Sequence, residues 1–171
     1  MHNFDVIVVG GGASGFFTAI NLAEQNPDLR IAILERSNEV LSKVKISGGG
    51  RCNVTHACFI PNVLAKFYPR GEKELKGPFH TFCTGDVIEW FNERGVSLKI
   101  EEDGRVFPES DNSQTIIDCF LNEAENFNIK IIKLTIVQQL SKEDDFWKIE
   151  TSKDTYQAKQ VVMATGSNVK I

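Results

Sequence analysis

Three glycines near the amino terminus are spaced as G-x-G-x-x-G. They are Gly10, Gly12 and Gly15 in the stretch GGGASG, and Glu35 follows about twenty residues later. In this pattern the first glycine allows a tight turn, the second lets the backbone approach a pyrophosphate, and the third lets a helix pack closely on a strand. An acidic residue at the distance of Glu35 accepts hydrogen bonds from ribose hydroxyl groups. These residues therefore predict a dinucleotide site.

A strand and a helix must hold this turn in place. The β-branched run Asp5–Val9 predicts a strand buried on both faces, apolar residues recur at helical spacing through Ala13–Gln25, and Ile31–Glu35 predicts a second buried strand. Strand, helix and strand together have the length of one βαβ unit. The helix would present unpaired N–H groups and its positive dipole end to phosphates. A glycine-rich turn without a ligand is the alternative, which the joint presence of these elements disfavours.

A second glycine-rich stretch, SGGGRCNVT, covers Ser47–Thr55. Three consecutive glycines leave the backbone bare, so a flat ring or a phosphate could lie directly on it. Arg51 would favour an anionic reduced ring if it lay near a flavin, and it would pair with a pyrophosphate if it lay there. A mobile surface loop is the alternative. Cys52 has no C-x-x-C partner, so we expect no redox role for it, and His56 is either a surface residue or a proton donor near a ring.

The middle of the chain predicts short helices joined by loops. Helices are expected at Asn62–Phe67 and at Asp86–Arg94, the latter capped by Thr84 or Asp86 and ended by Gly95. The remainder of 61–77 is expected to be surface loop because it holds prolines, glycines and lysines. A turn at Gly104 leads into an extended piece that ends at Pro108.

The last third of the chain favours FAD over NAD, which the fingerprint alone does not separate. A helix is predicted over Ser113–Phe127, and the strand-like runs after it are joined by short turns, which indicate antiparallel neighbours. A plain NAD-binding domain continues with further strand–helix units. Three or four antiparallel strands, followed by a buried strand ending in Ala164-Thr165-Gly166, are typical of flavoproteins with two dinucleotide folds. The predicted runs are 130–133, 135–141, 146–151, 155–159 and 161–164.

Size and composition limit the possible classes of protein. The chain has 171 residues, enough for one domain or slightly more, and its 42% hydrophobic content supports a packed core. A formal net charge of −4 argues against a nucleic-acid partner. No apolar run is long enough to span a bilayer and the amino terminus lacks the pattern of a signal peptide, so the expected location is cytoplasmic. The four cysteines form no C-x-x-C pair, so we expect no metal site.

Four segments together resemble one family. They are DVIVVGGGASG, the segment K-x-SGGGRCNVT that starts at Lys45, GRVFP at Gly104, and the terminal ATG. The chain resembles the amino-terminal part of the HI0933-like flavoproteins, also called the BaiN or aminoacetone oxidase type of NAD(P)/FAD-dependent oxidoreductases. The resemblance extends over essentially all of the chain, and SGGGRCN is its most specific element.

The resemblance implies an assignment of cofactor contacts. Gly10, Gly12, Ala13, Ser14 and Gly15 would form the pyrophosphate turn, and Glu35 with Arg36 would hold the adenosine ribose. Lys45 and the segment 49–55 would run along the flavin side of FAD. Val137 would meet adenine through its backbone, and Ala164, Thr165 and Gly166 would pass near the ribose and phosphates. The residues implied in the segment 49–55 are Gly49, Gly50, Arg51, Cys52, Asn53, Val54 and Thr55.

We therefore expect an α/β, Rossmann-like FAD-binding domain of the glutathione-reductase type, with a parallel sheet and an antiparallel β-meander. The implied activity is oxidation or reduction of a small organic substrate by hydride transfer through the flavin. NAD(P)H is a candidate electron donor in the longer family members. Residues 1–171 are expected to form the amino-terminal part of the FAD-binding domain, without the family's inserted substrate domain and carboxyl-terminal return, and to be inactive alone. The alternatives are a folded fragment without cofactor and an NAD-binding module.

Overall fold

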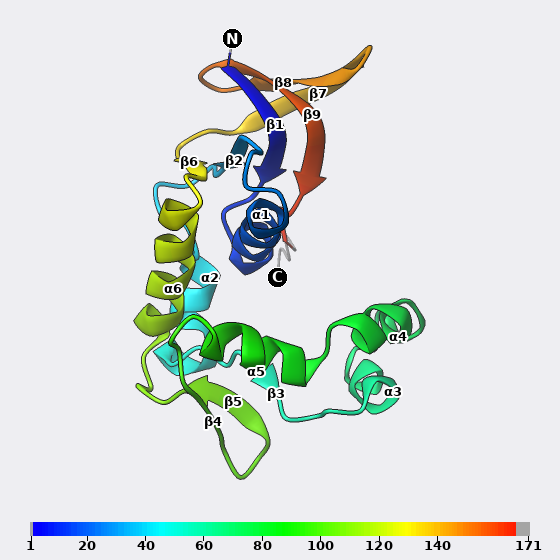
Figure 1. Ribbon diagram of the computed structural model, residues 1–171, viewed down its shortest axis with the longest axis vertical. Helices are drawn as coiled ribbons and strands as arrows, with labels where there is room; N and C mark the ends of the chain where they lie inside the picture. The colour runs from blue at the N-terminus through cyan, green and yellow to red at the C-terminus, as the bar shows by residue number, and fades with distance from the viewer. Residues whose placement is uncertain (1, 167–171) are drawn as a thin grey trace. The chain divides into compact units, whose positions relative to one another are not determined.

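The computed structural model describes residues 2–166, which divide into two compact units. Within these residues, unit 1 comprises 2–44 and 120–166, and unit 2 comprises 45–119. Each unit is described by itself, and its elements are labelled in Figure 1.

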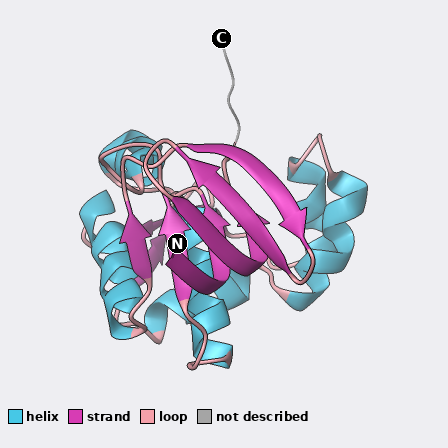
Figure 2. Ribbon diagram, turned by 90° about the horizontal axis from the view of Figure 1, so that it is seen from above, coloured by secondary structure: helices cyan, strands magenta, loops and turns pink. Residues whose placement is uncertain are grey.

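Unit 1 is built on a six-stranded sheet with the order β6-β2-β1-β9-β8-β7. Neighbours from β6 to β9 run parallel, and the β9-β8 and β8-β7 pairs are antiparallel. Figure 2 shows the strands side by side with a pronounced twist. The strands are β1 (His2–Val9), β2 (Ile31–Leu34), β6 (Lys130–Ile132), β7 (Val137–Glu143), β8 (Phe146–Thr151) and β9 (Thr155–Met163).

The predicted βαβ unit is present. Helix α1 spans Ala13–Gln25, as expected, and parallel pairing aligns Val6 with Ile31 and Val9 with Leu34. All four residues of β2 and the last four of β1 are buried. Such continuous apolar runs are typical of parallel strands covered on both faces. The helix buries four of its apolar side chains, namely Phe16, Ala19, Ile20 and Ala23.

The strand pairing settles one open question and corrects one prediction. The sequence allowed three or four antiparallel strands, and because β6 pairs in parallel with β2, the meander has three, β7 to β9. The runs at 155–159 and 161–164 were expected as separate strands, but β9 is continuous. Its intervening residue, Gln160, pairs in register with Val6 of β1. A polar side chain in a strand does not interrupt the backbone ladder.

Unit 2 combines short helices with a three-stranded sheet of order β3-β5-β4. Its strands are short, and both pairings are antiparallel. Helices α2 (Ser42–Ile46) and α6 (Ser113–Asn126) run across the boundaries of the two units. The elements are η1 (Ser47–Gly50), β3 (Thr55–His56), α3 (Pro61–Leu64), η2 (Ala65–Phe67), α4 (Glu72–Thr81), α5 (Thr84–Asn92), β4 (Leu98–Ile100) and β5 (Arg105–Pro108).

Helix α4 was not predicted, because the segment 61–77 was expected to be loop beyond a short helix. Glu72 and Glu74 lie in its first turn, where carboxylates interact favourably with the helix dipole, and Lys76 lies 3.8 Å from Glu72 at i,i+4 spacing. These local contacts offset the low helix propensity of Gly77 and Pro78 within α4. The α3–η2 segment agrees with the predicted helix at 62–67. The predicted cap of α5 is displaced to Cys83, whose N–H donates to the Asp86 carboxylate at 2.6 Å.

An ionic cluster on Asp5 joins β1 to Lys159 of β9 and to Arg30, the residue before β2. The Asp5 carboxylate accepts hydrogen bonds from the Arg30 backbone N–H at 3.0 Å and from its side-chain Nε at 3.3 Å, and it lies 2.9 Å from Lys159 Nζ. The Arg30 N–H is the leading cause that lowers the pKa of Asp5 to about 2. A depressed folded-state pKa adds stability above the unfolded pKa, and this stability is lost as pH falls through the folded value.

Replacing Asp5 with asparagine is expected to lower the free energy of unfolding at pH 7 by about 1–2 kcal/mol, allowing for the exposed partner side chains. The difference from wild type should persist down to about pH 4 and disappear near pH 2. Urea unfolding across this range measures it. Asp28→Asn, at an exposed position, is the matched control. A difference that is unchanged at pH 2 would contradict the ionic origin.

Candidate dinucleotide site

The three glycines of the turn between β1 and α1 have two different roles: two allow close backbone packing and one leaves an open space. A Cβ at Gly10 would lie 2.3 Å from the Ala164 carbonyl oxygen, and a Cβ at Gly15 would lie 2.0 Å from the Gly10 carbonyl oxygen. Glycine is therefore required at both positions, because any side chain would collide with the neighbouring backbone. A Cβ at Gly12 would meet nothing within 4 Å. The space beside Gly12 is open, as expected for a position that admits a phosphate.

Helix α1 begins beside this open space without a side-chain cap. Its N-cap, Gly12, has extended backbone angles, and its first turn contains no acidic residue. The first turn of a helix has backbone N–H groups without intrahelical partners, and the dipole is positive there. Ala13 and Ser14 are exposed at this end. The amino terminus of α1 is thus suited to an anion.

The Glu35 carboxylate connects the glycine turn to the end of β2. Its Oε2 accepts a hydrogen bond from the Gly11 N–H at 2.8 Å, and its Oε1 accepts one from the Ser37 N–H at 2.8 Å. The Gly10 N–H donates to the Leu34 carbonyl at 2.8 Å. Each carboxylate oxygen has further acceptor capacity, so Glu35 can hold the turn and still accept ribose hydroxyl groups.

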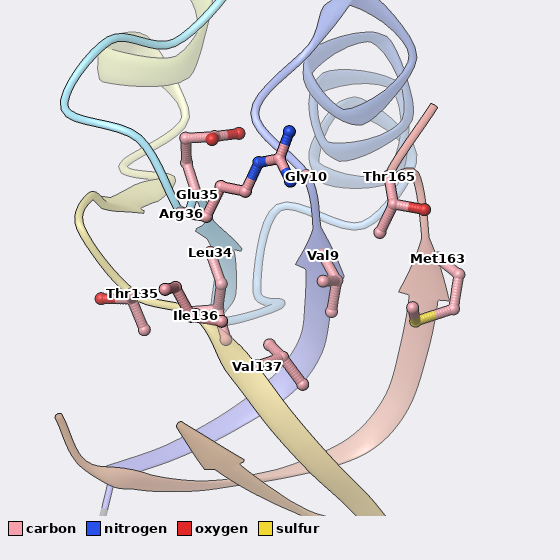
Figure 3. A pocket seen from close by; sticks show the side chains of 10 residues that line it. All are labelled: Val9, Gly10, Leu34, Glu35, Arg36, Thr135, Ile136, Val137, Met163 and Thr165. Carbon is pink, nitrogen blue, oxygen red and sulfur yellow. The ribbon is translucent and has the colours of Figure 1, made fainter. Parts of the chain in front are cut away.

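A cavity of about 270 Å³ opens at the carboxyl ends of the parallel strands of unit 1. Figure 3 shows Glu35 and Arg36 at one side of it and Met163 and Thr165 at the end of β9. Ligands in open α/β sheets bind at this edge. Its size suits one nucleoside-sized part of a larger ligand. The lining residues are Val9, Gly10, Leu34, Glu35, Arg36, Thr135, Ile136, Val137, Met163 and Thr165.

Five of the predicted cofactor residues therefore line one cavity. They come from sequence positions as distant as Gly10 and Thr165, and they include Glu35, Arg36 and Val137. Ala164 lies directly behind the turn, where its N–H donates to the Val9 carbonyl at 2.8 Å and its carbonyl packs against Gly10. Gly166 has a left-handed φ of 68° and is exposed.

Sequence reasoning missed the apolar half of the cavity lining, which consists of Val9, Leu34, Ile136 and Met163 together with buried Thr135. Ile136 and Met163 are 52% and 58% exposed, so their apolar surface remains available to a ligand. The end positions of the predicted strands could have indicated Val9, Leu34 and Met163. Thr135 lies in the β6–β7 connection and is fixed by two hydrogen bonds: its N–H donates to the carbonyl of Glu35, which follows β2, and its hydroxyl donates to the Lys133 carbonyl.

The remaining predicted cofactor residues belong to unit 2. Lys45 is exposed, and its carbonyl accepts a hydrogen bond from the Ser113 hydroxyl at 2.9 Å. We call Ser47–Gly50 the three-glycine turn; its glycines have left-handed φ angles of 56°, 69° and 88°. A Cβ at Gly49 or Gly50 would meet nothing within 4 Å.

The residues after the three-glycine turn are held by the small sheet. The Val54 N–H donates to the Val106 carbonyl at 2.8 Å, Thr55 pairs with Val106, and exposed Asn53 lies between the turn and β3. Cys52 is buried, and burial raises the pKa of its thiol. A buried thiol of raised pKa is a poor nucleophile. His56 is half-buried, and its imidazole packs against Gly104.

A model of the HI0933-like protein Rossmann domain matches residues 4–170. The chain belongs to the HI0933-like family. The family expected from SGGGRCN and its companion segments is confirmed.

Two curated relatives of this HI0933-like chain have names that describe reactions. It is 28% identical over 166 residues to the ribosomal RNA dihydrouridine synthase of Escherichia coli (strain K12), covering 97% of this chain and 40% of that protein. It is 27% identical over 160 residues to the 3-dehydro-bile acid delta(4,6)-reductase of Clostridium scindens, covering 93% and 38%. The chain spans about 40% of the length of these relatives.

Solved structures share the fold. The quinol fumarate reductase of E. coli superposes with a TM-score of 0.69 at 16% identity, covering 98% of this chain and 33% of that chain. The 3-ketosteroid-delta4-(5alpha)-dehydrogenase of Rhodococcus jostii gives 0.69 at 18% identity, covering 97% and 46%. The thioredoxin reductase of T. acidophilum gives 0.56 at 20% identity, covering 100% and 38%. The predicted Rossmann-like fold of the FAD-binding, glutathione-reductase type is confirmed.

Among residues 2–166, no three His, Cys, Asp or Glu side chains are grouped to hold a metal ion. Over the same part of the chain, none of the helices has the length and apolar character that crossing a membrane requires.

Proposed function

We propose that this chain is the FAD-binding portion of a flavin-dependent oxidoreductase. The observation that carries the proposal is the cavity at the carboxyl ends of β1, β2 and β9, which adjoins the uncapped amino terminus of α1. A nucleoside cavity beside an anion site is the arrangement that the ADP half of a dinucleotide requires. The three-stranded meander and the family membership favour FAD over NAD as the dinucleotide.

The residues present fit the ADP half of FAD. Gly12 leaves room for the pyrophosphate, and the N–H groups at the start of α1 would bind it. Glu35 would accept the ribose hydroxyl groups, while the apolar side chains of Ile136 and Met163 would cover the adenine and exclude water. The family resemblance assigns Lys45 and the segment 49–55 to the flavin side, with Ala164, Thr165 and Gly166 near the ribose and phosphates.

Bound FAD supplies hydride transfer through its flavin ring, and the protein supplies binding, orientation and electrostatics. In unit 1, those contributions come from the backbone groups of the glycine turn and of α1, from Glu35, and from the apolar side chains of Ile136 and Met163. The proposal gives Cys52 no role as a nucleophile, because its thiol is buried and has a raised pKa.

We further propose that this chain is the amino-terminal portion of a longer FAD-binding domain, and that the whole protein catalyses a reduction. Essentially all of the chain aligns with about two-fifths of the E. coli relative. The names of both relatives denote reduction of a carbon–carbon double bond, so the same reaction class is proposed here, with NAD(P)H as candidate donor. The net charge of −4 supports a small organic substrate over a nucleic acid. Four free cysteines support a cytoplasmic location.

Calorimetric titration of the purified protein with FAD, ADP and NAD⁺ tests the proposal. FAD is expected to bind with visible flavin absorption, ADP is expected to bind more weakly, and NAD⁺ is expected to bind no better than ADP. A colourless protein that takes up no added FAD would contradict the proposal. Binding of NAD⁺ but not of FAD would show an NAD-binding module instead.

Replacing Glu35 with glutamine in the same titration should weaken both FAD and ADP binding by roughly 1–3 kcal/mol, about fivefold to 150-fold in the dissociation constant. The amide presents an NH₂ group where the carboxylate now accepts from Gly11 or Ser37, and it removes the charge that holds the ribose. Glu125→Gln, on the exposed face of α6, is the control and should bind FAD like the wild type. Unchanged ADP affinity in the Glu35 variant would remove Glu35 from the site.

A further inference from the structure

Arg51, which directly follows the three-glycine turn, lies within a cluster of charged side chains in unit 2. Its Nη1 is 2.5 Å from Glu101 Oε1 and 3.2 Å from Asp111 Oδ1, and its Nη2 is 3.4 Å from Glu101 Oε2. The two nitrogens thus meet the two oxygens of Glu101, which is the fork geometry that guanidinium groups favour. Glu101 follows β4, and Asp111 lies between β5 and α6.

The same cluster neutralises the charge of Arg51. Asp111 also pairs with Lys99, and Glu101 also lies 3.7 Å from Arg105, which in turn pairs with Asp103 at 2.7 Å. Three cations therefore face three carboxylates. Lys99 and Arg51 lower the pKa of Asp111, so these contacts are between charged groups at neutral pH. A phosphate approaching Arg51 would have to displace two carboxylates and meet their repulsion.

Arg51 and the three-glycine turn share one packing partner, the ring of Phe107. The Arg51 guanidinium carbon lies 3.9 Å from the centre of this ring. A Cβ at Gly48 would lie 2.7 Å from the ring edge and 2.7 Å from the Asn53 backbone nitrogen. Phe107 is fully buried in β5. One rigid side chain thus supports the first glycine of the turn and the arginine that ends it.

We infer that Arg51 is a positioning residue and does not supply a charge to the cofactor. It holds the three-glycine turn against β4 and β5 through its contacts with Glu101, Asp111 and Phe107. We call this set of contacts the clasp. The inference rests on the proposed function, in which this turn lies on the flavin side of FAD. It replaces the two roles considered from the sequence, pairing with a pyrophosphate and stabilising an anionic flavin. Three successive glycines with left-handed φ angles are free to adopt many other conformations, so contacts with neighbouring residues are needed to hold the turn in this one.

The clasp and a direct cofactor contact predict opposite results for Glu101→Gln. If Arg51 binds the cofactor itself, weakening its competing carboxylate frees the guanidinium, and FAD affinity stays the same or rises. If Arg51 acts as a clasp, Glu101→Gln loosens the turn and lowers FAD affinity in the same direction as Arg51→Met. The ADP half of the cofactor is assigned to unit 1, so ADP affinity should not respond to the clasp.

The experiment measures FAD and ADP affinity by calorimetry for wild type, Arg51→Met, Glu101→Gln and the double variant. Arg51→Met is expected to weaken FAD binding about tenfold and Glu101→Gln several-fold, with the double variant no weaker than Arg51→Met. ADP affinity should stay within about twofold. Arg94→Met is the matched control, because Arg94 is stacked on Trp90 at the same 3.9 Å but lies beyond helix α5; its FAD affinity should equal that of wild type.

Amide hydrogen exchange of the segment 45–55, measured without ligand, tests the clasp independently of FAD. Arg51→Met and Glu101→Gln should each accelerate exchange in the turn by about tenfold, and Arg94→Met should not. Accelerated exchange in a protein that binds no FAD would leave the clasp standing and overturn the proposed function. Unchanged exchange, unchanged or tighter FAD binding in Glu101→Gln, or an equal loss of ADP and FAD affinity would each overturn the clasp.

Discussion

Gly15→Ala is expected to lower the free energy of unfolding by about 3 kcal/mol, at the upper end of the usual cost of overpacking. The added Cβ would lie 2.0 Å from the Gly10 carbonyl oxygen and 3.5 Å from a Val8 methyl group. The first of these atoms is backbone at the end of β1, so it cannot rotate away, and α1 must move off the sheet. Urea unfolding followed by circular dichroism measures the loss.

Gly12→Ala is the matched control for this measurement, because it adds the same methyl group three residues away. Nothing lies within 4 Å of the new Cβ, and the Gly12 backbone, with a φ of −91°, is extended and open to any residue. Its free energy of unfolding should therefore match that of wild type within about 0.5 kcal/mol. Equal destabilisation by the two substitutions would show that the turn, and not close packing of α1 on β1, is the sensitive feature.

Gly12→Val is expected to weaken FAD binding about a hundredfold or more while leaving the fold intact. The branched side chain fills the space in which the pyrophosphate would approach the start of α1. Loss of two hydrogen bonds to a charged group, at about 1.5 kcal/mol each, corresponds to about a hundredfold in the dissociation constant. Calorimetric titration with FAD and with ADP measures the change, and both affinities should fall together.

Gly77→Val is the control for this binding experiment. Gly77 is exposed in α4, and a Cβ there also meets nothing within 4 Å, so the chemical change is the same at a position outside the proposed site. Its FAD affinity should stay within about twofold of wild type. A Gly12→Val protein that is folded and still binds ADP normally would place the pyrophosphate elsewhere.

The sequence predicted most of the elements that depend on interactions between residues close together in the chain. The bounds of α1, the glycine turn and the parallel β1–β2 pair follow from patterns contained in about thirty consecutive residues. Helix α4 was missed because the prolines, glycines and lysines of 61–77 favoured a loop, whereas Glu72 and Lys76 stabilise its first turn. Propensity is a weak guide when such contacts compete with it.

Contacts between residues far apart in the chain could not be predicted from the sequence patterns. Arg51 stands out as a cation beside three glycines, yet the partners that decide its role, Glu101 and Asp111, lie 50 and 60 residues away. Glu35 was expected to face a ribose, and the structure adds that its carboxylate also binds the Gly11 N–H. In both cases the residue type indicated which interactions the side chain can make. Only the fold shows which protein groups already interact with it.

The pairing of β1 with β9 has a consequence for how the chain is made. The two strands align from His2 with Tyr156 to Val9 with Met163, so partners lie about 150 residues apart. A ribosome that adds residues at about 5–20 per second exposes one edge of β1 for many seconds before its neighbour exists. Closing so long a loop is entropically costly and slows folding. The glycine turn is completed only when the Ala164 carbonyl reaches Gly10, so a nascent chain should acquire its nucleotide late, and an unpaired β1 is the segment most in need of chaperone protection.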